Sequence, residues 1–133
     1  MFSKEFWRPS AFGRGNCMAK RILIVDDDFD DLQTMKTLLE KAGYTTVPAT
    51  NGAKALDMLK SNGFDLVLLD IQMPTLSGYD LLRLLREKMN HDAKMAYVSI
   101  VPQKEVDMND IDGFIQKPFS PASFIKEVKR ILK

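Results

Sequence analysis

Two short apolar runs that each end in carboxylates constrain this chain more than any other feature. Residues 22–25 read Ile-Leu-Ile-Val and are followed by five carboxylates within residues 26–31. Residues 66–69 read Leu-Val-Leu-Leu and end on Asp70. Runs this short and this apolar are typical of strands buried on both faces of a parallel sheet. Because ligands of open α/β sheets bind outside the carboxyl ends of the strands, the acids predict a divalent-metal site there, and with it phosphate chemistry.

Strand and helix patterns alternate from residue 21 onward, and apolar spacing of three and four residues predicts helices with one apolar stripe. The predicted strands are residues 21–25, 44–47, 66–69, 95–99 and 111–115, with Pro48 expected to halt the second. The predicted helices are residues 29–42 ended by Gly43, residues 55–59 followed by Gly63, a helix capped by Ser77 and Asp80, and one that begins at Ser120 and Pro121. Short connections and right-handed crossovers then give an α/β fold with a doubly wound, five-stranded parallel sheet.

The fourth connection is too short for a normal helix. After Pro102 only residues 103–110 remain before the fifth predicted strand, with Val106 and Met108 as the apolar residues. A helix of two turns at most is marginal without packing. We therefore expect a shortened fourth helix.

Composition excludes several classes of function. The chain has 133 residues, an apolar fraction of 45% and a net charge of +1, which fit one globular domain and give no electrostatic basis for direct nucleic-acid binding. The single cysteine, Cys17, cannot form an intrachain disulfide, and the lone histidine, His91, lies in a polar stretch. No apolar stretch reaches the roughly 18 residues of a membrane span. We expect a cytoplasmic protein without membrane insertion.

The first residues form a separate part of the chain. Residues 1–19 lack an apolar period and a secretory h-region, and therefore predict a flexible extension before a domain at residues 20–133. The alternative is a docking arm that uses the aromatic residues Phe2, Phe6, Trp7 and Phe12.

Each candidate site residue also has a plain structural interpretation. The acids after the first strand suit the N-terminus of a helix, although Asp26 and Asp27 still belong to the strand end. Asp70 alone suits a turn, Lys117 an exposed surface and Ser99 a helix cap. The expected fold changes this balance. Neighbouring first and third strands would bring Asp70 beside Asp26 and Asp27, where Mg²⁺ would relieve their repulsion.

Together these residues suit phosphoryl transfer. The carboxylate of Asp70 is a nucleophile toward phosphorus, and catalysis of such a transfer is mostly positioning and charge neutralisation. Mg²⁺ on Asp26 and Asp27, the ammonium of Lys117 and the hydroxyl of Ser99 would each take one phosphoryl oxygen. The sequence contains neither a Cys/His zinc spacing nor a glycine-rich nucleotide loop.

Three motifs resemble the receiver domains of two-component response regulators. They are residues 22–28 (Ile-Leu-Ile-Val-Asp-Asp-Asp), residues 68–74 (Leu-Leu-Asp-Ile-Gln-Met-Pro) with Gly78, and residues 114–119 (Phe-Ile-Gln-Lys-Pro-Phe). The order of these motifs is highly specific, and the resemblance covers roughly residues 20–133. It implies a flavodoxin-like sheet in which the strands, numbered along the chain, have the order 2-1-3-4-5.

The resemblance implies a role for the acidic residues. Asp70 would be the phosphoacceptor, charged by a phosphohistidine of a sensor histidine kinase or a histidine phosphotransfer protein. Asp26 and Asp27 would bind Mg²⁺ or Mn²⁺ together with Asp70 and the backbone carbonyl of Gln72.

The resemblance also implies a switch pair, Ser99 and Phe114, in which the hydroxyl moves to the phosphoryl group and the ring turns inward behind it. Lys117 would be a catalytic cation, and its bond to the following proline is usually cis in the family. Ile100 departs from the family, which favours a small residue there. Its branched side chain predicts a long-lived phospho-Asp70 or slow loading. The short segment between Ser99 and Lys117 predicts a rearranged or mobile output surface.

We expect a stand-alone receiver that switches a surface for an unknown downstream protein, with no enzymatic activity beyond self-phosphotransfer and autodephosphorylation. The alternative is a degenerate receiver that binds proteins independently of phosphorylation. A third class is a hydrolase with an aspartyl-phosphate intermediate, such as a haloacid-dehalogenase-like phosphatase. Gln72 argues against this class, because it stands where the second aspartate of those enzymes would lie.

Overall fold

The computed structural model describes residues 19–61, 63–72, 78–88, 93–109 and 111–133. The predictions for the extension at residues 1–18, for the loop at residues 73–76, for the cap at Ser77 and for the exposure of His91 lie outside these residues.

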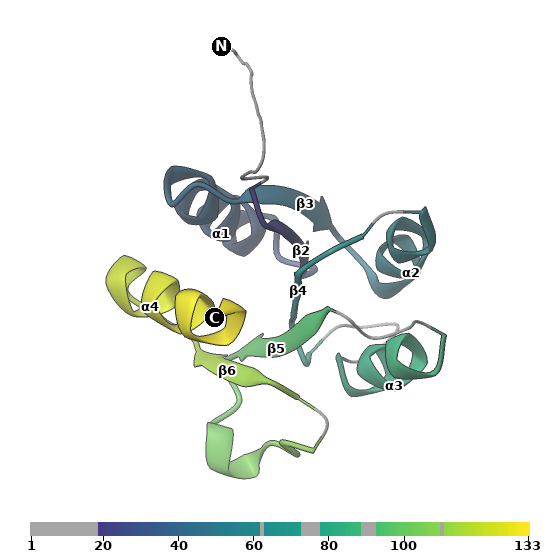
Figure 1. The fold of residues 1–133 in the computed structure, drawn as a ribbon. Coiled ribbons are helices and arrows are strands. Elements are labelled where there is room, and N and C mark those ends of the chain that lie inside the picture. Colours follow the sequence, from purple (N-terminus) through teal and green to yellow (C-terminus); the bar gives the residue numbers. More distant parts are fainter. Residues whose placement is uncertain (1–18, 62, 73–77, 89–92, 110) are drawn as a thin grey trace.

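The core is one parallel sheet of five strands (Figure 1). The strands are β2 (Arg21–Val25), β3 (Thr45–Ala49), β4 (Leu66–Leu69), β5 (Lys94–Ser99) and β6 (Gly113–Gln116). Their order across the sheet is β3-β2-β4-β5-β6. This confirms the predicted doubly wound sheet and the order 2-1-3-4-5. Strands β2 and β4, which carry the two acidic ends, are direct neighbours.

Helices cover both faces of the sheet, as Figure 1 shows. Helices α1 (Phe29–Lys41) and α4 (Pro121–Leu132) lie on one face, and α2 (Gly52–Ser61) and α3 (Gly78–Lys88) lie on the other. Side chains alternate along a strand, so Ile22 and Ile24 of β2 pack with α1 and α4, whereas Leu23 and Val25 pack with α2 and α3. Burial on both faces explains why β2 and β4 read as continuous apolar runs.

Local signals in the sequence set the ends of several helices. The carboxylate of Asp28 accepts hydrogen bonds from the backbone N–H groups of Asp30 and Asp31 and so caps α1. Gly43 adopts a positive φ of 97° just after α1, a conformation that glycine adopts without the steric cost of a side chain. Ser120 caps α4 by accepting a hydrogen bond from the N–H of Ser123. The predicted roles of Gly43 and Ser120 are confirmed.

Two local predictions need correction. Pro48 does not halt the second strand but lies inside β3, in register with Ile24 of β2. Since β3 is an edge strand, a residue without an N–H is tolerated there. The last strand begins two residues later than predicted, at Gly113.

The fourth connection contains less helix than the sequence predicts. Between β5 and β6 the described residues contain only a 3₁₀ turn, η1 (Gln103–Glu105). Val106 follows it and is buried against the cluster under α2 and α3. With one buried apolar residue, the segment lacks the apolar stripe that would hold a longer helix to the sheet.

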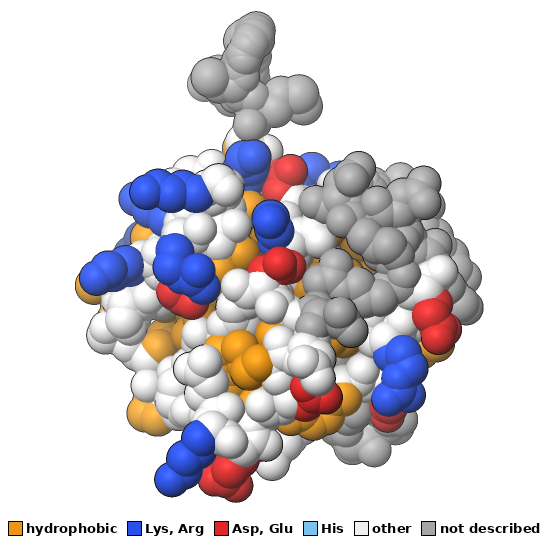
Figure 2. Space-filling model, turned by 60° about the horizontal axis from the view of Figure 1, so that its bottom comes forward, with side chains coloured by type: hydrophobic (Ala, Val, Ile, Leu, Met, Phe, Trp, Pro, Cys, Tyr) orange, Lys and Arg blue, Asp and Glu red, His pale blue; other side chains and the backbone are white. Residues whose placement is uncertain are grey.

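The described surface is of mixed character. On the face in Figure 2, acidic and basic side chains are interspersed with small apolar areas, which is ordinary for a protein surface. Among the helices in the described part of the chain, none has both the length and the apolar character needed to cross a membrane.

Candidate functional site

The site forms where neighbouring strands end at one edge of the sheet. The sheet hydrogen bonding continues one residue past these ends. The N–H of Asp26 donates to the carbonyl of Ala49 (3.2 Å), and that of Asp70 donates to the carbonyl of Val25 (2.9 Å). The N–H of Lys117 donates to the carbonyl of Ser99 (2.8 Å). The backbone of each of these residues is therefore fixed by the sheet rather than by a free loop.

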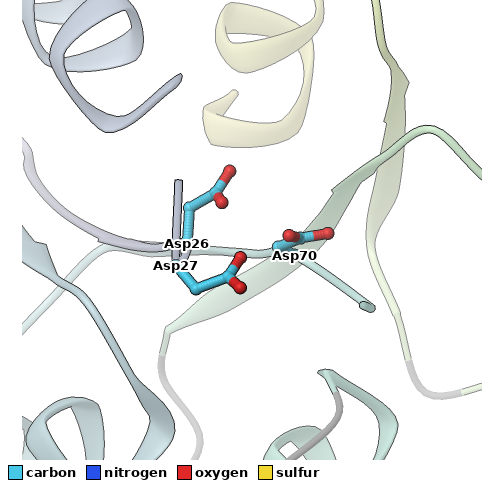
Figure 3. Close-up of side chains that lie close together, drawn as sticks. All are labelled: Asp26, Asp27 and Asp70. Carbon is cyan, nitrogen blue, oxygen red and sulfur yellow. The ribbon is translucent and has the colours of Figure 1, made fainter. Parts of the chain in front are cut away.

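Three carboxylates from two strands lie close together at this edge. One oxygen from each of Asp26, Asp27 and Asp70 lies within 4.8 Å of the others. In Figure 3 the carboxyl groups of Asp26 and Asp27 both lean toward the side on which Asp70 lies. Asp26 and Asp70 are buried and Asp27 is exposed. The structure thus brings together the three acids that the sequence placed on separate strands.

The surroundings of Asp70 disfavour its ionised form. Burial, followed by the nearby charge of Asp26, raises the pKa of Asp70 from 3.8 to about 6, although Lys117 and a hydrogen bond from the N–H of Gln72 act in the opposite direction. That N–H lies 3.2 Å from the carboxylate. Carboxylate oxygens are the preferred ligands of hard divalent cations. The donor set and the raised pKa both fit a bound Mg²⁺ or Mn²⁺.

Lys117 lies against the acids but does not bind Asp70. Its ammonium is 2.7 Å from Oδ2 of Asp26 and 2.8 Å from Oδ2 of Asp31. Burial lowers the pKa of Lys117, but the hydrogen bonds to Asp26 and Asp31 outweigh it and leave the pKa above its ordinary value. The Lys117–Pro118 peptide bond is cis, as the family resemblance implied.

Asp31 is one of two site residues that the sequence pattern did not reveal. The pattern predicts it only as an acid at the N-terminus of a helix. That interpretation fits Asp28, which caps the helix. The carboxylate of Asp31 instead accepts a hydrogen bond from the ammonium of Lys117, just after β6. Its place five residues after Asp26 was the only available signal, and the signal depends on how α1 is rotated over the sheet.

The proposed switch residues lie on β5 and β6. Ser99 is fully buried at the end of β5, and Phe114 of β6 is buried as well. The Ser99 hydroxyl accepts a hydrogen bond from the N–H of Val101 (3.1 Å), so its own proton remains to be donated to another acceptor. Sequence reasoning also missed Gln116, whose side-chain amide donates to the carbonyls of Ser99 and Ile100 (both 3.0 Å) and so anchors the chain after β5.

Comparison with known proteins decides the family. The model of the response regulator receiver domain matches residues 22–129. The chain belongs to this family. It is therefore a receiver of two-component signalling, and receivers generally interact with histidine kinases or phosphotransfer proteins and with downstream targets.

Several named relatives resemble this receiver over nearly their full length. The polar-differentiation response regulator DivK of Brucella anthropi is 29% identical over 120 residues, which are 86% of this chain and 98% of DivK. The chemotaxis protein CheY4 of Vibrio cholerae matches with a TM-score of 0.81 and 25% identity, over 86% of this chain and 100% of CheY4. The response regulator TrrA of Thermotoga maritima, solved in complex with Mg²⁺-BeF, has a TM-score of 0.77 and 33% identity, over 85% of this chain and 99% of TrrA.

Proposed function

We propose that this receiver accepts a phosphoryl group on Asp70 from a phosphohistidine, in a Mg²⁺- or Mn²⁺-dependent reaction of a phosphorelay. One observation carries the proposal: the oxygens of Asp26, Asp27 and Asp70 lie within 4.8 Å of one another. Next to them stands the ammonium of Lys117. An acidic cluster with a neighbouring cation suits the charge distribution of phosphoryl transfer.

The reaction forms one bond and breaks one. A carboxylate oxygen of Asp70 attacks phosphorus while the bond between phosphorus and the imidazole nitrogen breaks. The imidazole leaves with the electron pair of that bond, as a neutral ring because its other nitrogen carries a proton, and Asp70 neither gives nor takes a proton. The reaction needs Asp70 in its ionised form, which is the nucleophilic one.

The other residues of the site orient and neutralise the phosphoryl group. Asp26, Asp27 and Asp70, with the backbone carbonyl of Gln72, would hold the metal, which supplies positive charge against the phosphoryl oxygens. The likeness to TrrA, whose structure contains Mg²⁺-BeF, supports this role. Lys117 supplies a second cation and the Ser99 hydroxyl a hydrogen-bond donor. Movement of Ser99, with Phe114 behind it, would then alter the surface presented to a downstream protein.

We further propose that the chain is not an enzyme acting on a separate substrate. Gln72 stands two residues after Asp70 and has no ionisable proton with which to assist turnover. The only turnover we expect is slow hydrolysis of the chain's own aspartyl phosphate.

Mass spectrometry of the intact chain tests the phosphoacceptor. Incubation with acetyl phosphate and MgCl₂ should add the mass of one phosphoryl group to wild type, and removal of the metal with EDTA should prevent it. Asp70→Asn should gain no mass, whereas Asp57→Asn, a substitution of an exposed acid on α2, should be modified like wild type. A wild-type chain that stays unmodified in the presence of Mg²⁺ would refute the proposal.

One observation favours a second function, a protein-binding module that works without phosphorylation. The connection between β5 and β6 contains only the η1 turn among its described residues, so a phosphorylation-dependent surface of the usual helical kind is absent from this part. The two functions are separated by partner capture with and without beryllofluoride and Mg²⁺. Capture that depends on beryllofluoride supports the phosphoacceptor, and equal capture supports the module.

A further inference from the structure

The ammonium of Lys117 is shared between two carboxylates, and neither of them is Asp70. The side chain of Lys117 is only 9% exposed, that of Asp26 is 1% exposed, and that of Asp31 is 39% exposed. Asp31 comes from the first turn of α1 and reaches across to the chain that follows β6. It is not one of the three clustered acids. It also lines a cleft of about 280 Å³ with Thr34, Lys117, Pro118 and Phe119.

This sharing opposes the proposed reaction. A phosphoryl group on Asp70 brings additional negative charge, and Lys117 is the cation beside the cluster. Two of the three N–H donors of the ammonium are held by Asp26 and Asp31, so a movement of the ammonium toward a phosphoryl oxygen stretches or breaks these two hydrogen bonds. Each charge-assisted hydrogen bond to a carboxylate raises the cost of that exchange. Asp31 therefore competes directly with the phosphoryl group for the ammonium.

We propose that Asp31 is a positioning residue that holds the Lys117 ammonium away from Asp70 in the unphosphorylated receiver and so lowers the affinity of the site for a phosphoryl group. The inference rests on the proposed function of Asp70. It assigns to Asp31 a role in setting how readily the receiver is loaded, in addition to its place in the first turn of α1.

The bonding of Asp26 gives this role a second consequence. Oδ1 of Asp26 accepts from the N–H of Asp28 (2.9 Å), and Oδ2 accepts from Lys117 (2.7 Å). A metal ion that binds Asp26 must compete with the ammonium for this carboxylate. When the metal takes the carboxylate of Asp26, the ammonium can keep its hydrogen bond to Asp31. Loss of Asp31 should therefore strengthen phosphoryl binding and weaken metal binding, two effects of opposite sign.

Titration with beryllofluoride, a phosphoryl analogue, tests the first effect. Amide NMR spectra of the full chain in saturating MgCl₂ report the dissociation constant. Asp31→Asn should tighten beryllofluoride binding roughly two- to fivefold, the range expected for loss of an ion pair with one partly exposed partner. The control is Asp30→Asn. Asp30 is the neighbouring residue and its side chain is exposed, so this variant removes the same charge and should change the dissociation constant by less than about twofold.

Titration with MgCl₂ alone tests the second effect. Asp31→Asn should weaken Mg²⁺ binding more than Asp30→Asn does, and Asp31→Glu, which keeps a carboxylate within reach of Lys117, should restore both constants toward wild type. A purely structural role for Asp31 would not move the two constants in opposite directions. Urea unfolding checks that the variants fold, and Asp31→Ser replaces the amide variant if that one does not.

The outcomes separate this inference from the proposed function. If Asp31→Asn and Asp30→Asn shift beryllofluoride binding equally, or if Asp31→Asn weakens it, Asp31 has no positioning role while the phosphoacceptor stands. If wild type binds no beryllofluoride in Mg²⁺, the phosphoacceptor itself is wrong and the inference falls with it.

Discussion

The acidic edge, formed by Asp26, Asp27, Asp70 and Lys117, is held much more firmly than residues 100–109, the connecting segment that follows it. Three of the four residues of the edge continue the hydrogen bonding of the sheet, and a buried ion pair joins its two sides. The connecting segment has one short 3₁₀ turn, and Val106 is its one buried side chain. Regions with few buried contacts open more easily than regions with many, so the connecting segment should be less stable locally than the acidic edge.

The difference suggests how chemistry and response are divided in this receiver. The proposed phosphoryl transfer needs groups held in fixed positions, and the sheet supplies them. A response needs a part that can rearrange at small cost, and the connecting segment has few contacts to lose. Ser99 links the two regions, because its carbonyl accepts a hydrogen bond from the N–H of Lys117 and its hydroxyl accepts one from the N–H of Val101.

Removal of Lys117 should break the firm region and give the largest effect. Lys117→Met leaves Asp26, which is fully buried, without its cationic partner. A buried charge left unpaired costs about 3–5 kcal/mol. We expect the free energy of unfolding in EDTA to fall by about 3 kcal/mol, and Mg²⁺ to restore part of it. Urea unfolding in EDTA and in MgCl₂ measures both.

The matched control for this variant is Lys126→Met on the exposed side of α4, which should change stability by less than about 0.5 kcal/mol. A loss below about 1 kcal/mol for Lys117→Met, with no recovery in Mg²⁺, would mean that the ion pair does not hold the edge together.

Neutralising Asp70 should stabilise the metal-free receiver. The pKa of Asp70 is raised to about 6 in the fold, so the fold favours the protonated form. The ionised form therefore costs stability at pH 7.5, and this cost disappears as the pH falls from about 6 to 4, where the unfolded chain is also protonated. Asp70→Asn removes the cost and should be more stable than wild type at pH 7.5 by on the order of 1–2 kcal/mol in EDTA.

Urea unfolding at several pH values checks this sign. The difference between Asp70→Asn and wild type should vanish near pH 4 and reverse in Mg²⁺ at pH 7.5, because only wild type keeps all three carboxylates. Asp30→Asn should show no such pH dependence. If Asp70→Asn is less stable than wild type in EDTA at pH 7.5, the site is not destabilised by its own charge.

The firm region was largely predictable from the sequence. Buried strands of a parallel sheet read as apolar runs, and their neighbours are set by right-handed crossovers, so Asp26 and Asp70 had to meet at one edge. The switch pair was assigned by the family resemblance, and Ser99 also stands at the end of a predicted strand. These inferences depend on where the strands end, which the continuous apolar runs record directly.

The remaining details depend on contacts between elements that are distant in sequence. The pair of Asp31 and Lys117 joins residues that are 86 positions apart and depends on the rotation of α1. The place of Pro48 within β3 depends on that strand lying at the sheet edge. The reduction of the fourth helix to η1 depends on whether the packing of Val106 alone can keep a helix against the sheet. The spacing of apolar residues along the sequence does not predict any of these three details.

A mild variant should loosen the connecting segment alone. The hydroxyl of Tyr79 on α3 accepts a hydrogen bond from the N–H of Asp107 (3.4 Å), and the ring packs edge-on against Tyr97 at 5.5 Å. Tyr79→Phe keeps the ring and removes the acceptor, so the global stability should fall by only about 0.5–1 kcal/mol. Hydrogen exchange should quicken at residues 103–109 and stay unchanged in β2 and β4. Equal changes in both regions would contradict the proposed difference in local stability.

The smallest change in stability should come from Ile100, at the junction of the two regions. Its side chain is 62% exposed, so Ile100→Ala should alter the free energy of unfolding by less than about 0.5 kcal/mol. If the branched side chain shields phospho-Asp70 from water, the alanine variant should lose its phosphoryl group roughly two- to tenfold faster. Mass spectrometry after removal of the phosphodonor measures that rate, with Gln103→Ala on η1 as the control. An unchanged lifetime together with faster loading would instead assign Ile100 to the control of donor access, because the side chain would then hinder phosphorylation rather than hydrolysis.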